Sequence, residues 1–388
     1  MNLPVRAGNT RLRRGKALTA ALQPKKARVA YNGAPMVTAK HIAARLNMAI
    51  STVGRALADD PRISQRTKQR VRTAASEMGY IANRAARVMR GGSSNLVALA
   101  VPDIRNSFYS TIAHALSMCL QSAGLQLMLA ETDDDPLAER GQLRELVGAN
   151  VAGVILVPTA KPTTETIKLL QRVPHVQLLR RHESLGRHWF GMDDTDALEQ
   201  AARHLFDLGH RRIAYVGGTK DVTTGALRLR GVQRAAEAGR QRDPPVLEVL
   251  GPPSSSEFGR ETVARLLAQS TAPTALMAGS VQITHGMLEE LHRRRINVPR
   301  QLSVIGFGDE PGFSWWGPGL TTVAPPVFEL ATSCGLWFVH QLKSKVFADA
   351  PNSVVTPAVL VVRGSTAAPP TDAGNVGRRP RRSAKFPT

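Results

Sequence analysis

The sequence predicts a small all-α domain followed by a larger α/β body that is built of two Rossmann-like lobes. Two observations lead to this fold class. Residues 37–57 have the pattern of two short helices joined by a tight turn, which is a helix-turn-helix. From residue 96 onward, apolar runs alternate with amphipathic segments in two successive series. Alternation of this kind is typical of parallel sheets whose faces are covered by helices.

Positive charge is concentrated at the two ends of the chain. The formal net charge is +21, and residues 1–95 carry 19 Lys and Arg against three Asp and Glu. Residues 371–388 carry five against one, whereas residues 96–370 are almost neutral, with 27 against 26. A neutral body with a basic head is typical of a protein that binds a polyanion and has a separate second function. A basic ribosomal-type protein would spread its charge more evenly.

The composition favours a cytoplasmic protein that holds no metal and no cofactor. Cys119 and Cys334 lie on separate predicted helices, and neither belongs to a metal-binding or CxxC spacing. Residues 1–35 lack the apolar run of a secretory signal, and no stretch is long enough to span a bilayer. We interpret residues 1–35 either as a basic disordered arm or as a segment upstream of a true start at Met36. Residues 367–388 are expected to form a basic disordered tail.

The first predicted helix begins at Thr38, whose hydroxyl can cap it. Ile42, Ala43 and Leu46 recur at helical spacing and give this helix one apolar face. Asn47 follows, and Asn tolerates the left-handed conformation that a reversal of the chain requires. A helix that ends in a tight turn is therefore expected here.

The second predicted helix covers residues 50–57 and leaves Ser51, Thr52 and Arg55 on its outer face. A short helix that shows small polar groups and an arginine, inside a basic segment, fits the major groove of DNA. A third helix, expected over residues 64–78, completes a bundle of adequate size for a DNA-binding module. An ordinary surface helical hairpin is the alternative, because such patterns also arise by chance.

The body is expected to consist of two series of strands and helices. In the first series, the strands are residues 96–101, 125–129, 153–158 and 175–179, and the helices are residues 108–123, 136–149 and 164–172. In the second series, the strands are residues 212–218, 246–250, 274–278, 302–307 and 353–362, and the helices are residues 195–208, 224–238, 257–269, 281–294 and 326–346. Ligands of such folds bind beyond the carboxyl ends of the strands, so we expect a binding site in the cleft between the lobes.

Several segments carry a resemblance to a known family. They include VTAKHIAARL, STVGRAL, NRAARVMRGGSSN, VALAVPDIRNSFY, ARHLFDLGHRRIAYVGG, LSVIGFGD and LTTV, in this order over residues 37–365. The chain resembles the lactose-repressor/galactose-repressor (LacI/GalR) family of bacterial transcription regulators, and GFGD also resembles the gluconate-repressor branch. The resemblance implies an arm (1–35), a helix-turn-helix DNA-binding domain (36–82), a hinge helix and linker (83–95), a periplasmic-binding-protein-like effector domain (96–366) and a tail (367–388). It also implies a homodimer that binds a near-palindromic double-stranded DNA operator and a small effector.

DNA contacts in the first domain are assigned to five residues, namely Thr38, Ile50, Ser51, Thr52 and Arg55. By resemblance, Ile50, Ser51 and Arg55 read bases. Arg55 can offer a bidentate contact to guanine, and Ile50 can contact a thymine methyl group. Thr52 either holds a phosphate or only caps its helix. Ala49 departs from the family, which usually has a capping Ser there, so we expect a looser helix start.

Residues 83–90 resemble the family's hinge helix, which lies in the minor groove at the dimer axis. Met89 stands where the family usually has Leu, and an apolar wedge at this point kinks the duplex. Ala86 would let the backbone approach the groove, and Asn83 would hold a sugar or phosphate. Ala82 replaces a usual Pro, so we expect weaker ordering of this segment.

Effector contacts are assigned to six residues of the body, namely Phe108, Arg180, Asp193, Arg228, Asp309 and Trp315. By family position, Phe108 forms one wall of the pocket, and Arg228 holds a ligand hydroxyl or carboxylate. Asp193 matches an acid that faces the cleft. One of Trp315 and Trp316 is expected to stack on a sugar ring.

Three departures from the family change the charge of the predicted cleft. Many sugar-binding relatives have Asp directly after GF, where this chain has Gly308, with Asp309 one place on. Many have Asp followed by Arg after the HVQLL strand, where this chain has Arg at both places, starting with Arg180. Many also have an Asp at the position of Val281. The cleft therefore loses negative charges and gains a positive one.

A paired cation suits a carboxylate or a phosphate. We therefore hypothesise an anionic effector, such as a sugar acid, that is bound by Arg180 and Arg228. A neutral ligand with a solvated Arg180 is the alternative.

The sequence thus predicts an effector-controlled transcriptional regulator, most often a repressor, and not an enzyme. A stand-alone solute-binding protein of the transport class has the same two lobes, but the basic helical head and the missing signal argue against it. RIAYVGGTK lacks the spacing of a dinucleotide fingerprint, and neither a nucleophile elbow nor a metal-ligand cluster appears. His210 is interpreted as a structural residue at a helix end.

Overall fold

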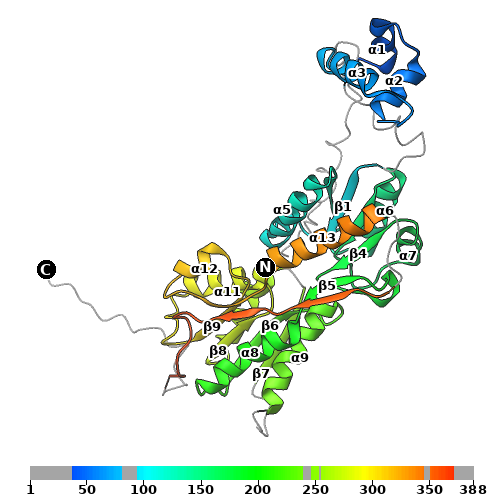
Figure 1. The fold of residues 1–388 in the computed structure, drawn as a ribbon. Helices are drawn as coiled ribbons and strands as arrows, with labels where there is room; N and C mark the ends of the chain where they lie inside the picture. The colour runs from blue at the N-terminus through cyan, green and yellow to red at the C-terminus, as the bar shows by residue number, and fades with distance from the viewer. Residues whose placement is uncertain (1–36, 81–93, 239–245, 253–254, 345–349, 371–388) are drawn as a thin grey trace, which may run out of the picture. The chain divides into compact units, whose positions relative to one another are not determined.

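The computed structural model describes residues 37–80, 94–238, 246–252, 255–344 and 350–370 (Figure 1). The chain divides into two compact units between residues 85 and 86, and each unit is described by itself. In the described ranges, no helix combines the length and the apolar character that a membrane crossing requires.

The first unit is a bundle of three helices, α1 (Ala39–Leu46), α2 (Ile50–Leu57) and α3 (Gln65–Glu77). Its core is small, and Ile42, Val53 and Val71, one from each helix, are fully buried in it. The helix pair and the third helix that the sequence predicted are therefore confirmed.

The ends of these helices follow from single residues. Asn47 ends α1 in the left-handed conformation, with φ at 50°. The Ser64 hydroxyl accepts a hydrogen bond from the Thr67 N–H and caps α3. The residue before α2 is Ala49, which has no side chain that can cap, so the first turn of α2 lacks a side-chain cap. Helix α2 nevertheless begins at Ile50, where the sequence placed it, and the looser helix start stays a prediction.

The second unit contains two six-stranded sheets, each of which forms the centre of one lobe. The first lobe has the strand order β11-β5-β4-β3-β1-β2, with β1 (Leu96–Val101), β2 (Gln126–Glu131), β3 (Gly153–Leu156), β4 (His175–Leu178), β5 (Trp189–Met192) and β11 (Ser353–Thr356). The second lobe has the order β12-β10-β9-β8-β6-β7, with β6 (Ile213–Gly218), β7 (Val246–Gly251), β8 (Ala275–Ala278), β9 (Ser303–Phe307), β10 (Thr321–Ala324) and β12 (Val359–Val361).

Helices cover both sheets, as the alternating pattern predicted. The first lobe carries α5 (Ser107–Ser122), α6 (Pro136–Gly148), α7 (Thr164–Leu170) and α13 (Val327–Ser344). The second lobe carries α8 (Asp194–Asp207), α9 (Thr223–Ala238), α10 (Ser256–Leu266), α11 (Val281–Arg293) and the short α12 (Pro311–Trp315). All strand pairs are parallel except β10 with β12, which is antiparallel.

The chain crosses between the lobes three times, which the simple two-series prediction missed. It passes from β5 to α8, from β10 to α13, and from β11 to β12. Helix α13 therefore packs on α5 of the first lobe, although the sequence placed residues 326–346 in the second series. The predicted strand 353–362 is also wrong as a single element, because it divides at Pro357 into a strand of each sheet (orange-red in Figure 1). Strands β5 and β10 were not predicted.

Close helix packing in the second lobe depends on glycines. A Cβ atom at Gly231 of α9 would lie 2.1 Å from the Thr195 carbonyl oxygen of α8. A Cβ atom at Gly286 of α11 would lie 1.8 Å from the Ser256 carbonyl oxygen of α10. The backbones of these helix pairs approach each other closely because these positions lack a side chain, as does Gly259 of α10, where a Cβ atom would lie 2.5 Å from the Ile283 carbonyl oxygen of α11.

We predict that Gly231→Ala destabilises the second unit by roughly 1–3 kcal/mol, since overpacking against a backbone forces two helices apart. Gly141→Ala is the matched control, because Gly141 lies inside α6 and a Cβ atom there has nothing within 4 Å. Alanine in an open helix position is favoured over glycine by up to about 1 kcal/mol. Thermal unfolding is the measurement, and equal melting temperatures for the two variants would contradict this account of the packing.

Candidate functional site

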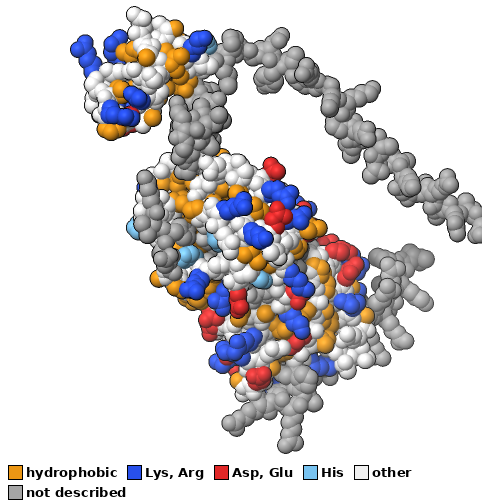
Figure 2. Space-filling view, turned by 90° about the vertical axis from the view of Figure 1, so that its right-hand side faces the viewer, with side chains coloured by type: hydrophobic (Ala, Val, Ile, Leu, Met, Phe, Trp, Pro, Cys, Tyr) orange, Lys and Arg blue, Asp and Glu red, His pale blue; other side chains and the backbone are white. Residues whose placement is uncertain are grey.

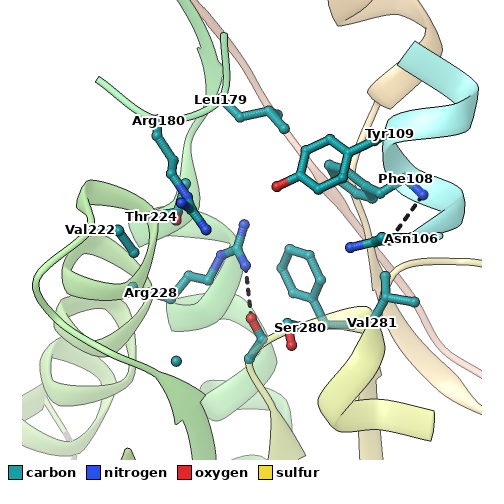
Figure 3. Close-up of a pocket in the computed structure, with 14 residues that line it drawn as sticks. Asn106, Phe108, Tyr109, Leu179, Arg180, Val222, Thr224, Arg228, Ser280 and Val281 are labelled. Carbon is teal, nitrogen blue, oxygen red and sulfur yellow. Dashed lines mark hydrogen bonds between the residues drawn. The ribbon is translucent and has the colours of Figure 1, made fainter. Parts of the chain in front are cut away.

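A closed pocket lies between the two lobes of the second unit (Figure 3). Its cavity volume is about 60 Å³. The first lobe contributes Asn106, Phe108, Tyr109, Leu179 and Arg180, and the second contributes Gly218, Val222, Thr224, Gly225, Arg228, Gly279, Ser280, Val281 and Phe307. These residues follow the carboxyl ends of strands in both sheets or begin the helices after them, as the sequence predicted for the cleft. We call this cavity the central pocket.

Arg228 is held rigidly on one side of the central pocket. Its Nε donates to Asp194 Oδ1 at 2.6 Å, and its Nη1 donates to the Gly279 carbonyl oxygen at 2.8 Å. Its guanidinium lies 4.0 Å from the centroid of the Phe307 ring. Burial raises the pKa of Asp194, and the Arg228 charge opposes that rise. The guanidinium is thus fixed in place before a ligand arrives.

Arg180 faces the same space from the first lobe and is 5% exposed. It makes a bidentate ion pair with Asp134, with Nη1–Oδ1 at 2.5 Å and Nη2–Oδ2 at 3.0 Å. The structure therefore contradicts the alternative in which Arg180 is solvated. Asp134 follows β2, so the pair joins the carboxyl ends of β2 and β4.

An uncommon backbone conformation directs Arg180 into the cleft. Leu179 has φ at 62°, which few residues other than glycine adopt. The Arg180 N–H donates to the Leu178 carbonyl oxygen at 2.7 Å and closes a tight turn. The Trp189 indole N–H donates to the Leu179 carbonyl oxygen at 3.0 Å and supports this turn. Local strain of this kind is concentrated at binding sites.

The lining of the central pocket is rich in hydrogen-bond donors. The Tyr109 hydroxyl points towards the two guanidinium groups in Figure 3, and burial raises the pKa of this phenol, so it stays protonated. Thr224, Ser280 and Asn106 add further polar groups. None of the lining residues in the described chain carries a carboxylate. The surface that meets a ligand is therefore cationic and donor-rich.

Three of the six predicted effector residues, Phe108, Arg180 and Arg228, line the central pocket. Asp193 does not, because it is the N-cap of α8 and its carboxylate accepts a hydrogen bond from the Asp196 N–H. The acid that contacts Arg228 is Asp194, one position later.

Asp309 and Trp315 also lie outside the central pocket. Asp309 makes a bidentate ion pair with Arg363, with distances of 2.7 Å and 2.9 Å, which keeps its carboxylate away from the cavity. Trp315 is 76% exposed at the end of α12, and Trp316 packs against the core of the second lobe. Neither indole therefore lies where it could stack on a sugar in the central pocket, and this prediction is wrong.

Two contacts join the lobes on either side of the central pocket. The Ser107 hydroxyl at the start of α5 donates to Glu310 in the second lobe, and the other oxygen of Glu310 lies 2.5 Å from His285 Nε2. On the other side, the Arg181 N–H donates to Thr223 Oγ1 at 3.1 Å. These contacts bridge the cleft between the lobes, and we call this bridged arrangement of the lobes closed.

The first unit exposes the face that the sequence assigned to DNA. Ile50 is 53% exposed, and Ser51 and Arg55 are exposed beside it on α2, whereas Thr52 is half-buried. Figure 2 shows Lys and Arg side chains on this unit, whereas the body mixes both signs of charge. The proposed hinge residues Asn83, Ala86 and Met89 lie outside the described residues.

Comparison with known proteins agrees with this combination of a small helical domain and a two-lobed body. The family description "Bacterial regulatory proteins, lacI family" matches residues 38–83, and "Periplasmic binding protein-like domain" matches residues 202–366. The regulator DegA of Bacillus subtilis is 30% identical over 331 residues, which cover 84% of this chain and 96% of DegA.

Solved structures share the fold at lower identity. The Lac repressor dimer bound to operator and an anti-inducer matches with a TM-score of 0.72 and 22% identity, over 86% of this chain and 100% of that chain. The complex of the regulator CelR with cellobiose matches with a TM-score of 0.60 and 24% identity, over 85% of this chain and 99% of that chain.

The fold and the relatives define a DNA-binding regulator with a ligand-binding domain. The chain belongs to the LacI family. It is a DNA-binding transcriptional regulator whose second unit has the periplasmic-binding-protein-like fold, and it is not an enzyme.

We predict that Arg55→Ala weakens binding to the specific operator by about 1–3 kcal/mol, which is the usual contribution of a bidentate arginine–guanine contact. Arg55→Lys is the matched second variant, because it keeps the positive charge and loses the planar guanidinium that can make two parallel hydrogen bonds. Fluorescence anisotropy with the operator and a scrambled duplex is the measurement. Arg55→Lys is expected to lose specific affinity and keep affinity for the scrambled duplex; equal losses on both duplexes would show that Arg55 contacts only phosphate.

We predict that Ser107→Ala loosens the closed arrangement of the lobes, because it removes the hydrogen bond between the lobes and leaves α5 intact. Backbone amides at residues 308–311 and 223–225 are expected to exchange with deuterium several-fold faster than in the wild type. Ser110→Ala is the control, since its hydroxyl bonds only to the Ser107 carbonyl oxygen within the same helix. Unchanged exchange in Ser107→Ala would rule out this role for the contact.

Proposed function

We propose that this regulator is a homodimeric repressor whose affinity for its operator is controlled by a sugar acid whose carboxylate is bound in the central pocket. The observation that carries the proposal is the convergence of two buried guanidinium groups and a phenol hydroxyl on a cavity whose lining has no carboxylate in the described chain. Carboxylates accept from guanidinium and hydroxyl donors with short, strong hydrogen bonds. The remaining polar side chains of the pocket suit ligand hydroxyl groups.

Asp134 and Asp194 orient the two arginines of the pocket and weaken their attraction for an anion. Asp134 and Asp194 each contact a guanidinium from the side away from the ligand, so the arginines are oriented and partly neutralised. Each guanidinium has five N–H donors, and the remaining ones are available for an anion. We therefore expect the preference for an acid over its neutral analogue to come from oriented charge-assisted hydrogen bonds, at about 1.5–3 kcal/mol.

The relatives support a sugar skeleton for the effector. CelR was crystallised with cellobiose, a neutral sugar, which shows what one member of the fold binds. We infer the anion preference of the present chain from Arg180, which stands with Arg228 in the lining of the central pocket.

The DNA-reading side of the proposal rests on the exposed face of α2. Ile50, Ser51 and Arg55 read bases in the major groove, and Thr38 and Thr52 contact the backbone of the duplex. We propose the same division of the chain as the sequence suggested, with a helix-turn-helix domain over 36–82, a hinge over 83–95 and an effector domain over 96–366. Regulation of this kind takes place in the cytoplasm, where the operator lies.

Coupling between the two ligands requires that the effector favour one arrangement of the lobes. Effector binding changes the closure of the lobes, and the hinge segments of the dimer transmit the change to the DNA-binding domains. Coupling free energies of this kind are typically 1–3 kcal/mol, which corresponds to a 5- to 150-fold change in operator affinity.

The test compares gluconate with glucitol, which differ in a carboxylate against a hydroxymethyl group on the same carbon chain. Calorimetry on the full-length protein is expected to give at least tenfold tighter binding for gluconate. The double variant Arg180→Gln/Asp134→Asn keeps the net charge and is expected to reduce this preference. The surface pair Arg144→Gln/Glu165→Gln of the same lobe is the matched control. Equal affinity for gluconate and glucitol would refute the anionic effector.

A further inference from the structure

The central pocket is too small to hold a whole sugar acid. Its volume is about 60 Å³, whereas ligand pockets typically measure about 300–1,000 Å³. A larger cavity of about 240 Å³ adjoins it and shares Arg180 and Val222 as lining residues. The two cavities together reach the lower end of the usual range. We call the larger cavity the second chamber.

The second chamber is formed by three loops from both lobes, residues 158–160, 180–183 and 221–223. The hydrogen bond from the Arg181 N–H to Thr223 Oγ1 joins two of these loops across the cleft. The Arg181 guanidinium lies 4.9 Å from the centroid of the Trp189 ring, which fixes its stem. The chamber therefore belongs to the closed arrangement of the lobes, as the central pocket does.

Thr159 lines this chamber, and Glu139 lies behind it. Thr159 is 2% exposed, and its N–H donates to Glu139 Oε2 at 2.8 Å. Glu139 is fully buried, and burial raises the pKa of its carboxyl group. This buried polar contact holds the wall of the chamber in place.

The charges of the second chamber favour a neutral, hydroxyl-rich group over a second anion. Arg181 and His182 are matched by Glu183 and Asp221 among the lining residues. The lining thus contains both donors and acceptors, which suits the hydroxyl groups of a sugar ring.

A cavity on the opposite side of the central pocket is a weaker candidate. Its volume is about 310 Å³, it shares the apolar Phe108 and Val281 with the central pocket, and it is also lined by Asp309, Glu310 and Glu329. Asp309 is paired with Arg363, and Glu310 with Ser107 and His285, so two of its acids already have partners. Acids of one sign also repel an anionic effector.

We propose that the effector extends past Arg180 into the second chamber, so that it is an acid of more than one sugar unit, with a glycosyl group bound by Arg181 and Asp221. This inference rests on the proposed function for its anionic group, which lies at Arg180, where the two cavities meet. The glycosyl group is held by neutral hydrogen bonds in the second chamber.

The test is calorimetry on the full-length protein with two acids of different length, gluconate and lactobionate, the second being gluconate that carries a galactosyl group. Lactobionate is expected to bind at least tenfold more tightly. Ala160→Trp narrows the second chamber, where Ala160 lines only that cavity, and it is expected to weaken lactobionate by a much larger factor than gluconate, so that the gain is lost.

Controls separate this inference from the proposed function. Thr111→Trp narrows the opposite cavity and is expected to leave both affinities unchanged. Lactitol, the neutral analogue of lactobionate, is expected to bind weakly. Lactitol could instead bind as tightly as lactobionate, with Ala160→Trp abolishing the binding of both. That result would support a glycosyl site in the second chamber and refute the anionic effector. Three results would refute binding of a glycosyl group in the second chamber. Gluconate could bind at least as tightly as lactobionate, Ala160→Trp could leave lactobionate affinity unchanged, or none of these ligands could bind.

Discussion

The ion pair between Arg228 and Asp194 is the interaction on which the effector domain depends. Both side chains are nearly buried, and a charge of either sign left alone at this place would cost several kcal/mol. Asp194 begins α8 and Arg228 lies on α9, so the pair fixes the two helices that pack at Gly231. The same contact presents the remaining guanidinium N–H groups to the cleft. Stability of the second lobe and recognition of the ligand therefore share one pair of residues.

A second constraint shapes the cleft at the start of α11. Gly308 has φ at 85°, and a Cβ atom there would lie 2.4 Å from Val281 Cγ2. A side chain at position 308 would therefore force Val281 to shift. Val281 gives the central pocket an uncharged wall in the second lobe, and Arg180 with Asp134 places an ion pair on the side of the first lobe.

The fold was largely predictable from the sequence, because most of its determinants are local. Asn47 ends α1 and Ser64 caps α3, as expected, and the alternation of apolar runs predicted the two sheets. The crossings between the lobes were not predictable, because they depend on which sheet edge a late strand reaches. No local pattern in residues 353–362 separates β11 from β12 except Pro357.

The candidate site was predicted in part for a similar reason. Phe108, Arg180 and Arg228 were found because strand ends and family position mark them. The sequence analysis assigned Asp193 to the site, whereas Asp194 is the acid that contacts Arg228. The exact start of α8 decides which of these adjacent acids faces inward. Asp134 was missed because its role depends on a partner 46 residues away. Its place just after β2 was the available signal.

The central claim is that the cleft held by Arg228 and Asp194 governs operator binding. The most direct measurement is operator affinity by fluorescence anisotropy, with and without a saturating sugar acid, in the wild type and in Arg228→Gln/Asp194→Asn. The double variant removes both charges together, so no buried charge is left without a partner. The account predicts that the variant binds operator like the unliganded wild type and that its affinity no longer responds to the acid. A variant that folds, binds operator and still responds like the wild type would contradict the account.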